Sequence, residues 1–79
     1  AQLPSQMEGG MEPFAKRLKD PRKGRRIYQR EVAEHIGVSV RAYPFYESGR
    51  SEPNIAGLIA LAVYFDVSID YLVGRTDEP

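Results

Sequence analysis

The stretch QREVAEHIGVSVRAYPFYES, residues 29–48, decides the fold, because it places small and apolar residues where two helices can cross through a very short turn. Ala33 is small where the two backbones would approach each other, and Gly37 stands where the turn needs a positive φ. The buried contacts that would fix the crossing angle come from Val32, Ile36, Val38, Tyr43 and Tyr46. The stretch therefore predicts two packed helices joined at Gly37.

Pro44 is out of place in the second of these helices. Ser39 is a natural N-cap residue, and we expect the helix to run from there to Ser48 and to end at Gly49. Pro44 would then be its fifth residue, without the N–H that should bond to the Val40 carbonyl, at a cost of about 3 kcal/mol. We expect a bend or a lost hydrogen bond at Val40, and on these bounds Pro44→Gln should stabilise the protein.

A first helix precedes this stretch. Phe14 and Leu18 lie one helical turn apart and predict an amphipathic helix from about residue 12 to residue 19 or slightly beyond. Pro21 falls where the next core residue is expected, so we predict that it stops or kinks this helix.

The remaining helices are marked by their caps. The helix that opens the decisive stretch runs over about residues 28–36, Asn54 caps a fourth helix, and Ser68 caps a fifth that ends at Gly74. The apolar residues of the fourth helix are Ile55, Leu58, Leu61, Ala62 and Phe65. Because no segment alternates like a strand, we predict an all-α fold of five helices.

Charge is divided unevenly along the chain, although the net charge is zero. Residues 16–50 hold ten basic and four acidic side chains, a net charge of +6, whereas residues 51–79 hold one basic and five acidic side chains, a net charge of −4. The first segment suits a phosphate backbone and the second suits solvent or another subunit.

Composition excludes several classes of function. The 79 residues contain no cysteine, which removes disulfides and thiolate metal sites and fits a reducing, cytoplasmic setting. The longest apolar run, Ile55–Phe65, is about half of the roughly 20 residues that a membrane span needs. His35 is the single histidine, and we expect it to be solvated. We predict no enzyme, metal or cofactor, and no contact with a membrane.

Domain boundaries follow from the first ten residues, AQLPSQMEGG. They are polar, contain glycine and proline, and show no periodicity. We interpret residues 1–10 as a leader or flexible arm and residues 11–79 as one domain.

The segments FAKRLK, QREVAEHIGVS, YESGRSEPN and LAVYFDVSIDYLVGRTDEP carry a family resemblance. Together they resemble the Cro and phage-repressor type of helix-turn-helix domain, also called the Xre type, from residue 14 to residue 77. The resemblance implies a compact five-helix domain of the lambda-repressor-like type with its helix-turn-helix motif at 29–48. It also implies a sequence-specific regulator of transcription, commonly a repressor, that binds a two-fold operator in double-stranded DNA as a dimer with the 39–48 helix in the major groove.

Position by position, the resemblance implies that Val40, Arg41, Pro44 and Phe45 face the bases. Arg41 is the strongest candidate for specificity, because its guanidinium can bind guanine O6 and N7 together. Gln29 would bind a phosphate and brace the reading helix. The DNA-binding set implied in this way comprises Tyr28, Gln29, Ser39, Val40, Arg41, Pro44, Phe45, Ser48 and Arg50, with Arg25 and Arg26 as further backbone contacts.

Two residues of the reading helix have other expected roles. The spacing of Tyr46 and Glu47 points them inward or toward the first helix, so we interpret them as structural. Pro44 and the residue before it depart from the pattern usual in such domains. The alternative function is therefore a protein-interaction module of the same fold, such as an adaptor or antitoxin-like subunit.

The C-terminal end predicts a homodimer. Two short helices cannot bury all of its apolar side chains, which are Val63, Tyr64, Tyr71, Leu72 and Val73. We expect a two-fold dimer through the C-terminal helices, with its reading helices about 34 Å apart.

Overall fold

The computed structural model describes residues 12–79, and within that range every regular element is a helix. The helices are α2 (Glu12–Gly24), α3 (Gln29–Ile36), α4 (Tyr43–Ser48), α5 (Ile55–Phe65) and α6 (Ile69–Leu72). The all-α prediction is confirmed, whereas the interpretation of residues 1–10 lies outside the described residues. Within the described range, the helices are too short to cross a membrane.

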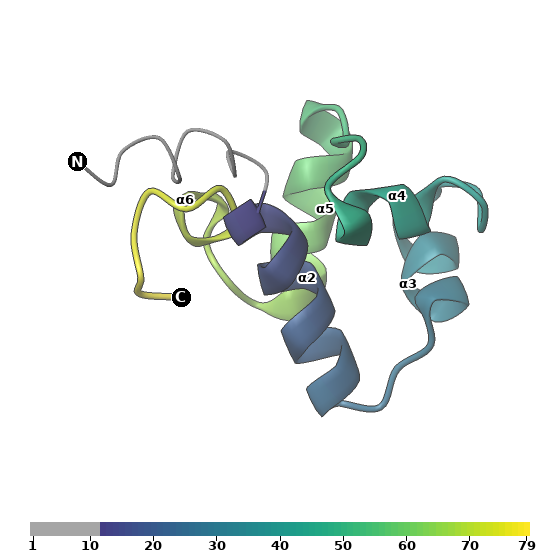
Figure 1. Cartoon of the computed structure of the whole chain (residues 1–79), viewed down its shortest axis with the longest axis horizontal. Coiled ribbons are helices and arrows are strands. Elements are labelled where there is room, and N and C mark those ends of the chain that lie inside the picture. The colour runs from purple at the N-terminus through teal and green to yellow at the C-terminus, as the bar shows by residue number, and fades with distance from the viewer. Residues whose placement is uncertain (1–11) are drawn as a thin grey trace.

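α2 organises the fold. It packs against α4 and α6, while α5 packs against α3 and α6. In Figure 1, α3 and α4 lie on one side of α2, and α6 lies on the other. The core between these helices contains Phe14, Leu18, Val32, Ala33, Tyr43, Leu61, Ala62, Phe65 and Leu72.

Pro21 does not stop α2, which continues through it to Gly24. The prediction that the helix ends there is wrong because the chain is held on both sides of the proline. Leu18 is fully buried one turn before it, and Arg22 forms an ion pair with Glu47 just after it. A proline removes only one hydrogen bond, and here that bond lies in the last turns of the helix.

The C-cap predicted for α3 and the N-caps predicted for α5 and α6 are confirmed, whereas α6 ends at Leu72 with Val73 as its C-cap, before the predicted end at Gly74. Gly37 has φ +81° after α3, and its N–H donates to the Ala33 carbonyl at 3.0 Å. Asn54 accepts from the Gly57 N–H at 2.8 Å, and Ser68 accepts from the Tyr71 N–H at 3.0 Å. These caps satisfy groups that a helix end leaves unpaired.

The second helix of the decisive stretch begins later than predicted. Residues 40–42 form a turn, and α4 starts only at Tyr43. Ser39 caps that turn instead, because its hydroxyl accepts from the Ala42 N–H at 3.0 Å. Pro44 thus lies in the first turn of α4, where a helix leaves its N–H groups unpaired. The bond to the Val40 carbonyl is absent as expected, but the predicted helix start at residue 39 is wrong.

This position reverses the expected effect of replacing the proline. Pro44→Ala should lower the free energy of unfolding by about 0.4–1 kcal/mol, because a compatible proline restricts the unfolded chain. Urea unfolding of the two proteins measures the difference. If alanine instead raises stability and adds helical ellipticity, the chain favours one continuous helix from residue 39, and a start of α4 at Tyr43 is contradicted.

α5 turns most of its predicted apolar residues to the core, with Leu61, Ala62 and Phe65 buried and Leu58 packed against them. Gly57 is buried, and a Cβ there would lie 3.0 Å from Pro53 Cβ, so the chain before α5 packs directly on this residue. The buried row accordingly runs through Gly57, Leu61 and Phe65. Ile55 lies off this row and is 77% exposed, unlike the other apolar residues predicted for this helix.

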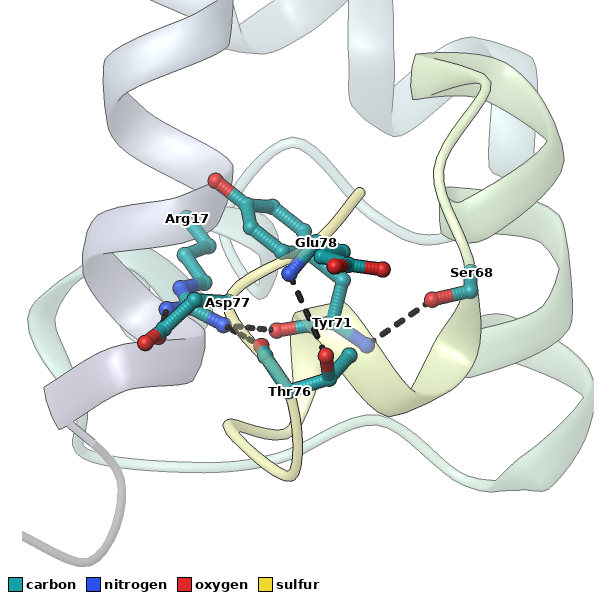
Figure 2. Close-up of polar contacts among 6 residues, drawn as sticks. All are labelled: Arg17, Ser68, Tyr71, Thr76, Asp77 and Glu78. Atoms are coloured by element: carbon teal, nitrogen blue, oxygen red, sulfur yellow. Dashed lines mark hydrogen bonds and ion pairs between the residues drawn. The ribbon is translucent and has the colours of Figure 1, made fainter.

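The segment after α6 is fastened to α2 by Arg17 (Figure 2). Its Nη1 donates to the carbonyls of Tyr71 and Thr76, both at 2.6 Å, and its Nη2 lies 2.8 Å from an oxygen of Asp77. The guanidinium also stacks over the Tyr71 ring at 4.1 Å. Arg17 thus joins α2 to α6 and to the segment that follows it.

Candidate nucleic-acid interface

The turn at 40–42 and α4 divide their side chains between the surface and the core. Val40 is 46% exposed, Phe45 is 45% exposed, and Arg41 is also exposed. Tyr43 and Glu47 are buried at 0% and 4%. The same short segment therefore offers one cation and two apolar side chains outward while its other side is anchored.

A buried ion pair anchors α4. Arg22 on α2 donates from Nε to Glu47 Oε2 at 2.6 Å and from Nη2 to Glu47 Oε1 at 3.0 Å. Gln29, the first residue of α3, donates from Nε2 to the same Oε1 at 3.1 Å. Arg22 Nη1 also donates to the Ile27 carbonyl at 2.7 Å. One carboxylate thus ties α4 to both α2 and α3, which fixes the direction of its outer side chains.

The pKa values of this cluster follow from the pairing. Burial by itself would raise the pKa of Glu47, but hydrogen bonds from Arg22 and Gln29 lower it below its ordinary value. The hydrogen bond to Glu47 likewise raises the pKa of Arg22. Burial raises the pKa of Tyr43, and the neighbouring carboxylate adds to that shift. The cluster at neutral pH is therefore an ionised pair beside a neutral phenol.

Gln29 has the bracing position expected of it, because its side chain reaches the carboxylate of α4. Tyr28 precedes it, is 71% exposed, and donates its N–H to the Glu31 carboxylate at 2.8 Å. Both residues lie at the start of α3, but the side-chain amide of Gln29 already donates a hydrogen bond to Glu47. A phosphate contact by Gln29 remains a prediction.

The loop after α4 folds back on the carbonyl of Phe45. That oxygen accepts from the Ser48 hydroxyl at 3.1 Å and from the Arg50 N–H at 3.0 Å. Gly49 makes this turn possible with φ +80°. The exposed side chains of Ser48 and Arg50 are thereby held beside the end of α4.

The side chains of Arg25 and His35 both contact residues at the end of α5. Arg25 points to the end of α5, where it donates to the Phe65 carbonyl at 3.2 Å and lies 5.6 Å from the centre of the Phe65 ring. The DNA-backbone contact predicted for Arg25 stays a prediction. His35, expected to be solvated, is exposed but lies against Tyr64 with 4.7 Å between ring centres.

Sequence reasoning missed the role of Arg22. The available signal was its position four residues after Leu18, on the face of the first helix that turns inward. A glutamate expected to point inward needs a cation. The sequence thus predicted that Glu47 points inward and needs a cation beside it, but it did not identify Arg22 as that cation.

Known proteins are similar to this chain in sequence. The helix-turn-helix family model matches residues 18–72. The chain is 36% identical over 66 residues to the HTH-type transcriptional regulator YobD of Bacillus subtilis, covering 84% of this chain and 59% of that protein. It is 41% identical over 64 residues to the cryptic phage CTXphi transcriptional repressor RstR of Vibrio cholerae, covering 78% and 57%.

A solved structure agrees with these relatives. A transcriptional regulator from Listeria innocua superposes with a TM-score of 0.75 at 39% identity, covering 84% of this chain and 62% of that one. The chain spans about three fifths of the length of the relatives it matches. The match to the family model, the similarity to these regulators and the shared fold agree. The chain belongs to the Xre type of the helix-turn-helix family.

Proposed function

We propose that this chain is a sequence-specific DNA-binding regulator that reads the major groove with α4 and the turn before it. The observation that carries the proposal is the division of this segment: Arg41, Val40 and Phe45 are exposed, while Glu47 is buried and paired with Arg22. A fixed helix that presents a cation and apolar atoms outward suits a groove lined by acceptors and thymine methyl groups.

A repressor acting in the cytoplasm is the most specific form of this proposal. Support comes from RstR, a relative of 41% identity that is named a transcriptional repressor. Support also comes from the basic segment at residues 16–50, which suits a phosphate backbone.

Arg41→Ala should cost about 1–3 kcal/mol of binding free energy and relax the preference at one base pair in each half-site. The experiment is selection of bound sites from random duplex DNA with wild type and variant, followed by affinity measurements on the selected sequence.

Arg50→Ala is the matched control, since Arg50 lies in the loop after α4 and should weaken all sequences alike. Equal losses on every sequence from both variants would mean that Arg41 contacts only the backbone.

The exposed apolar side chains favour a dimer contact on α5 over one on α6. Of the surface predicted from the sequence, Leu72 lies in the core and Tyr64 and Tyr71 are half-buried, whereas Val63 and Val73 are 73% and 39% exposed. Val63 lies on α5, where Ile55 is also exposed, at 77%. We therefore seek the partner's contact on α5.

The outer stripe of α5 consists of Ile55, Ile59 and Val63, spaced four residues apart. No residue of α5 is charged, and a helix that is apolar on all sides is normally covered. A second copy is the occupant we propose, because a residue close to a two-fold axis meets its own copy, where a charge would repel itself, and this face carries no charge.

A further inference from the structure

A cleft of about 290 Å³ opens beside the reading segment and lies between three helices. Its lining residues are Lys19, Arg22 and Lys23 from α2, Gln29 from α3, and Pro44, Glu47 and Ser48 from α4. Gln29, Pro44 and Ser48 belong to the predicted DNA-binding set, whereas Lys19 and Lys23 do not. The cleft thus continues the proposed DNA-facing surface onto α2.

The two lysines of this cleft repel each other in the folded chain. Lys19 and Lys23 are four residues apart on α2, where like charges repel each other. Neither takes part in an ion pair within residues 12–79, although Lys16 on the same helix pairs with Asp20 at 3.0 Å. An anion bound between the two ammonium groups would relieve this repulsion.

The other charges in the cleft cancel. Glu47 is the only acidic lining residue, and its carboxylate is held by two hydrogen bonds from Arg22 and one from Gln29. Its charge is therefore neutralised, and the cleft keeps the net charge of its two lysines. The Ser48 hydroxyl and the lysine ammonium groups are hydrogen-bond donors of the kind that phosphate oxygens accept.

We propose that this cleft binds one phosphate of the duplex backbone through Lys19 and Lys23. The inference rests on the proposed function, because it adds a backbone contact to the surface that reads the bases. The phosphate strands border the major groove, so a helix inserted in the groove brings its flanks near them. The flank of α4 that carries Pro44 and Ser48 forms one wall of the cleft, and the lysines of α2 form the opposite wall.

The test is the salt dependence of binding to a fluorescently labelled duplex of mixed sequence. Each phosphate contact contributes about −0.9 to the slope of log affinity against log salt concentration. The double variant Lys19→Gln with Lys23→Gln removes the one contact assigned to this cleft and should therefore reduce the steepness of the slope by about 0.9. Arginine at both positions keeps the charges and should restore the wild-type slope.

Lys16→Gln is the matched control, because it makes the same substitution on the same helix but at a lysine that already has a carboxylate partner. It should leave the slope nearly unchanged. If wild type binds DNA and the glutamine double variant keeps the wild-type slope or matches Lys16→Gln, the phosphate site is wrong while the proposed function stands. If wild type binds no duplex at low salt, both are wrong.

Discussion

Replacing Arg22 with methionine should lower the free energy of unfolding by about 3–5 kcal/mol, the cost of leaving a buried charge without its partner. The Glu47 side chain is 3% exposed and that of Arg22 is 12% exposed, so solvent cannot take over the lost interaction. Gln29 would remain as a single donor to the carboxylate. Since a domain is stable by about 5–15 kcal/mol, this one change removes a large share of the stability.

The pH dependence of the same variant has a defined sign. In wild type the pKa of Glu47 lies below its ordinary value of 4.5, so its contribution to stability is present at neutral pH and is lost as the pH falls through the folded pKa. Without Arg22, burial raises that pKa, and protonation then favours the folded variant as the pH falls. The stability difference between wild type and variant should therefore narrow from neutral pH toward pH 4.5.

Urea unfolding at several pH values measures both effects. The double variant Arg22→Met with Glu47→Leu is the control, because it removes both charges and should recover most of the lost stability. A loss below about 1 kcal/mol for Arg22→Met, or a difference that widens on acidification, would mean that the pair is not buried as described.

Ile59→Asp should raise the dissociation constant of the dimer by at least about 100-fold. A dimer through the outer stripe of α5 would bury two unpaired carboxylates at its centre, and each tenfold loss in affinity needs only about 1.4 kcal/mol. Ile59 is 47% exposed in the single chain, so the monomer should tolerate the change. Sedimentation equilibrium measures the constant, and binding to a two-fold operator should weaken with it.

Val73→Asp discriminates between the two candidate surfaces. Val73 follows α6, is 39% exposed, and belongs to the surface predicted from the sequence. We expect this variant to remain a dimer. If Val73→Asp dissociates the protein and Ile59→Asp does not, the dimer forms through the C-terminal end. Wild type that stays monomeric even with operator DNA would contradict either surface.

Local signals predicted most of the helix ends. Gly37, Asn54 and Ser68 act within four residues of themselves, since a cap satisfies backbone groups that are its neighbours in sequence. The start of α4 was predicted wrongly, although the signal for it was also local. Pro44 favours the first turn of a helix, but Ser39 offered a competing start and in fact caps the preceding turn.

Features that depend on distant residues were harder to predict. The partner of Glu47 lies 25 positions away on α2. The spacing from Leu18 places Arg22 on the inward face of its helix, but no local signal shows that the two side chains meet. The face that α5 turns to the core depends on the close packing of Pro53 on Gly57. From the sequence alone, Gly57 indicates only a weak helix former. The family resemblance implied outward positions for Arg41 and Phe45, and both side chains are exposed while Tyr43 and Glu47 are buried.

The central claim is that α4 and the preceding turn read DNA sequence, and the ratio of two affinities tests it most directly. A duplex carrying the sequence selected by the protein is compared with a mixed-sequence duplex of equal length at physiological salt. We predict that the selected sequence binds at least about 10³-fold more tightly. Equal affinities, or no binding to either duplex, would contradict the claim and favour a protein-interaction module of the same fold.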